Sequence, residues 1–119
     1  MVWEVEYTDF FGKWYHDLSE DLQDKVTAVV ELLEERGPAL GRPACDTLEG
    51  GRNPNLKELR PLGTNVRILF VFDPRRTAIL LVGGDKTGRW NEWYNEMIPV
   101  AERLYEEHLE ELREEGELK

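Results

Sequence analysis

Cysteine and histidine are scarce in this chain of 119 residues. Cys45 is the only cysteine, so no internal disulfide can form, and the CxxC and Cys/His spacings of zinc sites are absent. The two histidines, His16 and His108, both fall in expected helices, where a structural role is more common than a catalytic one. We therefore expect a reduced domain that uses no metal ion or other cofactor.

Long apolar runs are also missing. No segment reaches the roughly 18 consecutive apolar residues of a membrane helix. The first ten residues, MVWEVEYTDF, have neither the basic start nor the apolar stretch of a signal peptide. We expect a cytoplasmic protein without membrane contact, and the length favours one domain over residues 1–119.

Several common catalytic motifs do not occur. The stretch GGDKTG resembles a phosphate-binding P-loop. However, the two positions before the lysine at which this motif requires glycine are occupied by Leu80 and Asp85. There is no GxSxG nucleophile elbow and no HExxH metal motif. Asp73 and Asp85 have no neighbouring carboxylate that would suit glycosidase-like chemistry.

Charge is distributed unevenly along the chain, whose formal net charge is -10. Residues 36–89 contain ten Lys or Arg residues and five acidic residues. The two flanking segments together contain five Lys or Arg residues and twenty acidic residues. The acidic flanks are typical of solvated helix faces. The basic middle of the chain is suited to an anionic partner.

Hydrophobic periodicity predicts an α+β fold with the element order β-α-α-β-β-β-α. Alternation over residues 2–7 predicts a first strand, and apolar residues at helical spacing from Phe10 predict a helix capped by Asp9. Ser19 begins a second helix that ends at Gly37. These two amphipathic helices are expected to cover a mainly antiparallel sheet.

The remainder of the chain predicts that sheet and a last helix. Residues 37–55 are rich in glycine and proline and predict a long surface loop. A helix is expected from Arg89, with a kink or a new start at Pro99 and an acidic C-terminal helix and tail from about residue 99. The strands between loop and helix are expected at residues 56–62, at residues 66–72, and from residue 77 or 78 to residue 83.

Turn chemistry predicts how the first two of these strands pair. A two-residue turn at Gly63-Thr64 would place Arg60 directly opposite Arg67, with both side chains on one face of the sheet. Like charges in this position destabilise a sheet unless an anion lies between them. The pair therefore either binds an external anion or is a structural pair neutralised by local acids such as Glu58.

The next turn, Asp73-Pro74-Arg75-Arg76, has a typical type I sequence. A two-residue loop there would place Val82 opposite Arg67, and Lys86 would project to the face that carries both arginines. This agreement requires that no bulge occurs at the following glycines. A three-residue loop would shift the register and remove it.

Aromatic residues follow the basic cluster at Trp90, Trp93 and Tyr94. Arginine clamps a phosphodiester, and aromatic rings stack on unpaired bases, so this combination favours RNA as the ligand. Such a site could bind RNA without cutting it. It could also promote cleavage without metal, because the 2′-hydroxyl of RNA attacks the adjacent phosphate once the protein orients it, neutralises charge and moves protons.

The segments ELRP, VRILF, FDPRR and GGDKTG, in this order and spacing, resemble bacterial toxins of the RelE/ParE superfamily, in the HigB-like branch related to phage Gp49. The resemblance runs from VEYTDFF near the start to YEEHL. It implies a small RelE-like fold and the toxin of a type II toxin–antitoxin module. It also implies a metal-independent, ribosome-dependent messenger RNA endonuclease that leaves 2′,3′-cyclic phosphate ends. The implied partners are a helix-turn-helix antitoxin, messenger RNA and the ribosome, and the toxin would be a monomer or bound to its antitoxin.

The resemblance also implies roles for individual residues. Catalytic roles go to the cations of ELRP, VRILF and GGDKTG, which are Arg60, Arg67 and Lys86. RNA contacts are expected from Lys57, Trp90 and Tyr94. The chain departs from many ribosome-dependent toxins in its acidic net charge and in having no histidine on the strand face, so the general base stays open. The alternatives are a ParE-like inhibitor of DNA gyrase without nuclease activity and a non-toxic RNA-binding domain.

Overall fold

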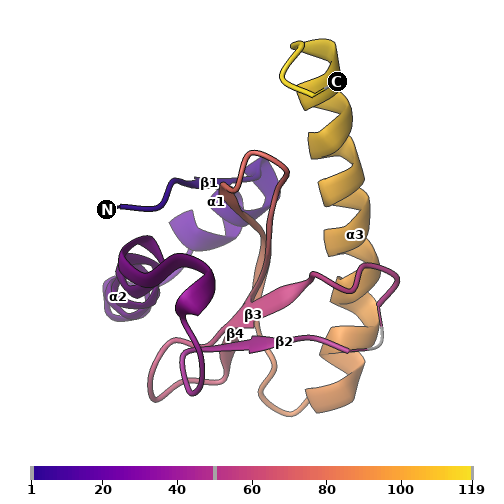
Figure 1. Ribbon diagram of the computed structural model, residues 1–119. Helices are drawn as coiled ribbons and strands as arrows, with labels where there is room; N and C mark the ends of the chain where they lie inside the picture. Colours follow the sequence, from indigo (N-terminus) through magenta and orange to yellow (C-terminus); the bar gives the residue numbers. More distant parts are fainter. Residues whose placement is uncertain (1, 50, 119) are drawn as a thin grey trace.

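The computed structural model describes residues 2–49 and 51–118 and has an α+β architecture. A five-stranded sheet in the order β1-β5-β4-β3-β2 lies between two helices on one face and a third helix on the other (Figure 1). β1 (Val5–Tyr7) pairs in parallel with β5 (Ala78–Asp85), and the other neighbouring strands are antiparallel. The predicted fold class is therefore confirmed.

The first two helices, α1 (Asp9–His16) and α2 (Glu20–Arg36), each begin at a hydroxyl cap. Ser19 caps α2, as predicted. Thr8 caps α1, so the prediction of Asp9 in this role is wrong. The Thr8 hydroxyl reaches a free backbone N–H of the first turn, and the carboxylate of Asp9 lies within that turn, next to the positive end of the helix dipole.

Regular structure occurs in the segment 37–55, where a long surface loop was predicted. It contains a 3-10 turn, η1 (Gly37–Ala39), and an edge strand, β2 (Cys45–Thr47), that pairs with β3 (Lys57–Leu59). The fold therefore has one strand more than predicted, and β3 is shorter than the predicted residues 56–62. A strand of three residues is too short to produce a recognisable alternation, and it forms because β3 satisfies its backbone groups.

β4 (Val66–Phe72) pairs with β3 in the predicted register, with Leu59 opposite Ile68. The connecting turn is wider than the predicted two-residue turn, because the ladder ends at Leu59. The Thr64 hydroxyl closes it with a hydrogen bond of 2.8 Å to a backbone carbonyl. Gly63 has a φ of 72°, which a side chain would disfavour.

The predicted register of β4 with β5 is wrong, because Arg67 lies opposite Gly84, two residues further along β5 than predicted. One residue of the shift comes from a three-residue loop, 74–76, whose last residue Arg76 has a φ of 67°. The other comes from a β-bulge midway along the strand pair. Two shifts of one residue restore the original side-chain face, so Lys86 still lies on the face of Arg67.

The core has a layer on each face of the sheet. α1 and α2 pack on one face, whereas α3 (Trp90–Glu114) packs on the other. Two tryptophans contact the adjacent glycines of β5: a Cβ at Gly83 would lie 2.3 Å from Trp14, and a Cβ at Gly84 would lie 2.3 Å from Trp93. The two glycines therefore let one helix on each face approach the sheet closely.

α3 is a single helix of 25 residues that contains Pro99, so the predicted new start of a helix at Pro99 is wrong. Pro99 is exposed, and solvent can satisfy the carbonyl that its missing N–H leaves free. The helix extends beyond the sheet toward the C-terminus (Figure 1). Its distal half is anchored by His108, whose Nε2 lies 2.9 Å from Oδ2 of the buried Asp73. None of the helices in residues 2–49 and 51–118 has the length and apolar character of a membrane span.

Candidate catalytic site at the start of α3

The site lies on the face of the sheet that α3 covers. The observed register, continued one residue past the end of β3, places Arg60 opposite Arg67. Lys86 follows β5, and Trp90 and Tyr94 project from the first turns of α3. Five of the six predicted site residues therefore lie at one end of the sheet.

Glu58 is the buried centre of this group, with only 2% of its surface exposed. Its Oε1 accepts a hydrogen bond of 2.8 Å from Nε of Arg60, and its Oε2 accepts one of 2.6 Å from the Tyr94 hydroxyl. Asp46 adds a second, longer ion pair to Arg60 at 3.4 Å. Arg60 is therefore neutralised by local acids, as the structural alternative predicts, and two carboxylates hold it in place.

Arg67 has a different environment from Arg60. Its NH1 group donates to the backbone carbonyls of Val66 at 2.8 Å and Thr64 at 3.3 Å. Within the described part of the chain it forms no ion pair, and its Nε is buried without a hydrogen-bond partner. The guanidinium is thus oriented by neutral groups and keeps its full charge for an external anion.

Lys86 is a buried cation with 8% of its surface exposed. Its Nζ lies 4.3 Å from the ring centre of Trp90 and 5.2 Å from that of Tyr94, within the range of cation–π attraction. Burial and then the charge of Arg67 lower the pKa of this ammonium, against the opposing effect of Glu58. A lysine in this environment gives up its proton more readily than an exposed one.

Tyr94 is the acid with the largest upward shift at the site. Burial, followed by the hydrogen bond to Glu58 and the charge of that carboxylate, raises the pKa of the phenol to about 12, although Arg67 opposes the shift. The hydroxyl is therefore protonated at neutral pH, and it donates to Glu58. Trp90, one helical turn before Tyr94, has 57% of its surface exposed, so the indole face away from Lys86 is available to a ligand.

Lys57 lies away from this group. It pairs with Phe70, and strand alternation directs its side chain to the face covered by α1 and α2. The same alternation puts Glu58 on the face of Arg60, two residues along. Glu58 was expected only as a neutralising acid, although its spacing of two from Arg60 was the available signal that it belongs to the site.

The arrangement is suited to an anionic substrate. Arginine and lysine side chains meet a protonated phenol and a buried carboxylate, which together can hold a phosphate and move protons. No set of three or more His, Cys, Asp or Glu side chains placed to bind a metal occurs in the described ranges.

Solved structures of low sequence identity show which known fold the chain adopts. The RelE toxin of E. coli matches with a TM-score of 0.58 at 11% sequence identity, over 70% of this chain and 83% of RelE. The toxin–antitoxin complex RelBE2 of Mycobacterium tuberculosis matches with a TM-score of 0.57 at 17% identity, over 71% of this chain and 99% of the matched chain. At these identities the similarity shows a RelE-like toxin fold.

Sequence comparisons then identify the family. The family described as phage-derived protein Gp49-like matches residues 13–106. HigB3 of M. tuberculosis, which is named as a toxin, is 50% identical over 97 residues, covering 82% of this chain and 85% of HigB3. HigB2 of the same organism, also named as a toxin, is 50% identical over 99 residues, covering 81% of this chain and 49% of HigB2. The chain belongs to the Gp49-like family and is a HigB-like toxin with a RelE-like fold.

Proposed function

We propose that this toxin is a metal-independent endonuclease that cleaves messenger RNA at the ribosome through attack of the RNA 2′-hydroxyl. The observation that carries the proposal is Arg67, a guanidinium oriented by backbone carbonyls, unpaired with any described acid and adjacent to Lys86, Arg60 and Tyr94. An unpaired cation among other cations is unfavourable in the free protein and becomes favourable when a phosphate binds.

The two arginines divide the binding of the scissile phosphate. Arg67 contributes a guanidinium whose charge no described acid neutralises, and this charge holds the non-bridging oxygens and stabilises the negative charge of the pentacoordinate transition state. Arg60 is fixed by Glu58 and presents its remaining N–H donors toward the same phosphate. Trp90, at the exposed edge of the site, stacks on a base next to the cleaved bond.

Proton transfer involves Tyr94, Glu58 and Lys86. The 2′-hydroxyl gives its proton to the Tyr94 oxygen while the phenol passes its own proton to Glu58, along the hydrogen bond of 2.6 Å. The Lys86 ammonium, whose pKa is lowered by burial and by Arg67, donates a proton to the departing 5′-oxygen. The products are a 2′,3′-cyclic phosphate and a 5′-hydroxyl.

Primer extension on cellular messenger RNA after induction of the toxin tests the proposal. New 5′ ends within coding sequences are expected for the wild type and are expected to be absent for Arg67→Ala. Intact transcripts together with DNA damage would point instead to inhibition of DNA gyrase. Normal growth with intact transcripts and DNA would point to a non-toxic RNA-binding domain.

A further inference from the structure

A pocket of about 430 Å³ lies against the first turns of α3, and its volume is within the range of small-molecule sites. Its walls come from two parts of the chain, α3 and the residues that follow β2. The lining residues are Leu48, Glu49, Asn91, Tyr94, Asn95 and Ile98. Because Tyr94 lines the pocket and also donates a hydrogen bond to Glu58, a ligand bound there would lie beside the proposed catalytic site.

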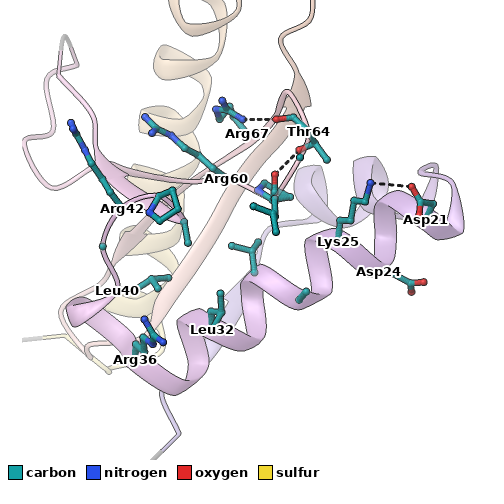
Figure 2. Close-up of a pocket in the computed structure, with 18 residues that line it drawn as sticks. Asp21, Asp24, Lys25, Leu32, Arg36, Leu40, Arg42, Arg60, Thr64 and Arg67 are labelled. Carbon is teal, nitrogen blue, oxygen red and sulfur yellow. Dashed lines mark hydrogen bonds and ion pairs between the residues drawn. The ribbon is translucent and has the colours of Figure 1, made fainter.

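The arginines of the catalytic site line a different cavity, of about 640 Å³. Figure 2 shows Arg60 and Arg67 at this cavity, with the hydrogen bond from Arg67 to Thr64 as a dashed line. Glu58 connects the two cavities, since its carboxylate bonds to Arg60 at 2.8 Å and to Tyr94 at 2.6 Å. An RNA strand whose phosphate binds the arginines can therefore place a neighbouring base in the smaller pocket.

The smaller pocket is unsuited to a phosphate. Among the described residues that line it there is no Lys or Arg, and the carboxylate of Glu49 is its one charged group. Its apolar surface comes from Leu48, Ile98 and the ring of Tyr94, which are partly buried in the core layer under α3. A nucleobase has two apolar faces and a polar edge, so this combination of side chains fits a base.

Hydrogen bonds hold the wall that carries Glu49. The backbone N–H of Leu48 donates to the carbonyl of Leu56 at 2.9 Å. Further along the chain, the backbone N–H groups of residues 52 and 53 donate to the carboxylate of Glu102 on α3. The wall is thus attached on both sides of Glu49, as expected of a pocket that exists before its ligand binds.

Asn91 and Asn95 lie one turn apart on the α3 wall, so their side chains occupy the same face of the helix. Each carboxamide can donate two hydrogen bonds and can also accept them. In the described ranges, the asparagine side chains that bond to other residues are those of Asn53 and Asn65. The exposed amides of Asn91 and Asn95 are therefore available to the edge of a base.

Guanine matches these donors and acceptors better than the other bases of RNA. Its N1–H and N2–H₂ groups are adjacent donors for the two oxygens of a carboxylate, and its O6 and N7 atoms are adjacent acceptors for amide N–H groups. In adenine and cytosine the amino group lies beside a ring nitrogen that accepts hydrogen bonds, and in uracil the N–H lies between two carbonyls. The Glu49 carboxylate would repel each of these acceptors.

We propose that this pocket binds a guanine base of the RNA strand near the scissile phosphate. Glu49 accepts hydrogen bonds from N1–H and N2–H₂, while Asn91 and Asn95 donate to O6 and N7. Leu48 and Ile98 contact the faces of the ring. The role of the pocket in cleavage rests on the proposed function, but selective binding of guanine does not.

Fluorescence anisotropy with short oligonucleotides tests the base preference of the full chain. The probes are labelled, 2′-deoxy-substituted oligouridine strands in which one central base is replaced by guanine, adenine, cytosine, hypoxanthine or 7-deazaguanine. The guanine probe is expected to bind about tenfold more tightly than the uracil, adenine and cytosine probes. Hypoxanthine lacks the N2 amino group and 7-deazaguanine lacks N7, so each should bind about threefold or more weakly than guanine.

Two substitutions with matched controls test whether the preference arises in the pocket. Glu49→Gln and Asn95→Ala should each reduce the ratio of guanine to uracil affinity about threefold or more. The affinity for the uracil probe should stay within about twofold of wild type. Glu106→Gln and Asn55→Ala change exposed residues of the same types outside the pocket and should leave the ratio unchanged. Circular dichroism shows whether each variant is folded.

Mapping of the new 5′ ends in cells provides a second measurement. If the toxin cleaves RNA as proposed, the ends produced by the wild type should lie at a fixed distance from a guanine. Glu49→Gln should still cleave RNA, but its ends should be spread over sites without this guanine. If no probe binds to the isolated chain, ends that keep the same distance from guanine in Glu49→Gln overturn the proposal, and ends that lose it support the proposal.

The other outcomes separate the pocket from the nuclease function. Equal affinity for all probes, a preference for another base, or a guanine preference that Glu49→Gln retains overturns the proposal. Binding of free GMP as tightly as the guanine probe would make the pocket a site for a free nucleotide and would also overturn it. Guanine-selective binding without cleavage in cells supports the pocket and refutes the proposed function, whereas cleavage without base preference does the reverse. Absence of both binding and cleavage refutes both.

Discussion

Arg60 and Arg67 have the same charge, but their surroundings give them different roles. Arg60 forms ion pairs with the buried Glu58 and with Asp46, so it stabilises the folded protein and orients a carboxylate. Arg67 donates hydrogen bonds to backbone carbonyls, which accept them without neutralising its charge. Removal of each side chain should therefore have a different effect on folding.

Arg67→Ala is expected to lower kcat/KM for RNA cleavage by about 10²- to 10³-fold, the usual effect of losing one donor to a transition-state oxyanion. Its free energy of unfolding should change by less than about 1 kcal/mol. Arg60→Ala should lower both activity and stability, the latter by about 1–3 kcal/mol, because Glu58 stays buried without its cation.

Cleavage assays and urea denaturation of the same preparations measure these two effects. A folded Arg60→Ala/Arg67→Ala double variant that remains as toxic as the wild type would refute the assignment of the site. Equal destabilisation by both single substitutions would refute the distinction between a structural and a substrate-binding arginine.

The pKa of Lys86 should determine the basic limb of the pH–rate profile. Its pKa is lowered, so the rate should begin to fall with loss of the ammonium proton below the ordinary lysine pKa of about 10.4. Lys86→Arg should move this limb to higher pH, since a guanidinium keeps its proton. The measurement is kcat/KM against pH, with the uncatalysed RNA hydrolysis subtracted, and an unchanged limb in Lys86→Arg contradicts the assignment.

The same shift has a consequence for stability. Between the lowered pKa of folded Lys86 and its ordinary pKa in the unfolded chain, the unfolded state binds more protons. The contribution of Lys86 to the free energy of unfolding therefore rises as pH increases through this window. The charged form of Lys86 is therefore disfavoured by folding, which is typical of a residue kept for function.

At the level of elements, α1 and α3 are held against the sheet through adjacent glycines of β5. Trp14 occupies the space that a Cβ at Gly83 would need, and Trp93 occupies the corresponding space at Gly84. Trp93 also contacts the site, because its ring lies edge-on to that of Tyr94 at 5.2 Å between centroids. The close approach of α3 to the sheet therefore determines where Tyr94 meets Glu58.

Gly84→Ala is expected to destabilise the protein by about 1–3 kcal/mol through overpacking against Trp93. It should also reduce cleavage, because displacement of Trp93 moves Tyr94. Gly41→Ala is the matched control, since a Cβ at Gly41 would have no described atom within 4 Å, and it should change stability by less than about 0.5 kcal/mol. Thermal denaturation measures both, and equal melting temperatures would contradict the packing argument.

At the level of the whole molecule, charges of opposite sign are separated. The site lies at the start of α3, while the distal half of that helix is rich in glutamate and extends away from the sheet (Figure 1). An anionic ligand is therefore attracted to one end of the molecule and repelled from the other.

Salt should act in opposite directions on binding and folding. If three cations contact phosphates, the logarithm of RNA affinity should fall with the logarithm of salt concentration with a slope of about -2. The free energy of unfolding should rise slightly over the same range, because salt screens the self-repulsion of a chain with a net charge of -10. Fluorescence anisotropy with a 2′-deoxy-substituted RNA oligonucleotide measures the RNA affinity, and urea denaturation measures the free energy of unfolding. RNA binding that does not depend on salt would contradict contacts between these cations and the phosphates.

Local patterns were enough to predict much of the framework. Ser19 and Gly37 delimit α2, alternation predicts β4, and the pairing of Arg60 with Arg67 follows from the register of one short connection. These features depend on residues close together in the chain, where caps, turns and side-chain period act directly. The segments that carry the resemblance to toxins, ELRP, VRILF, FDPRR and GGDKTG, are local patterns of the same kind. Membership of the Gp49-like family is confirmed.

Contacts between distant segments decided the rest. β2 forms because it pairs with β3. Lys86 reaches the site through a three-residue loop and a bulge, whose two shifts of one residue together return its side chain to the face of Arg67. The burial of Glu58 between Arg60 and Tyr94 depends on how closely α3 packs on the sheet. Periodicity indicates which face a side chain occupies, but packing sets its partners, and these partners determine the charge and hydrogen bonding of the site.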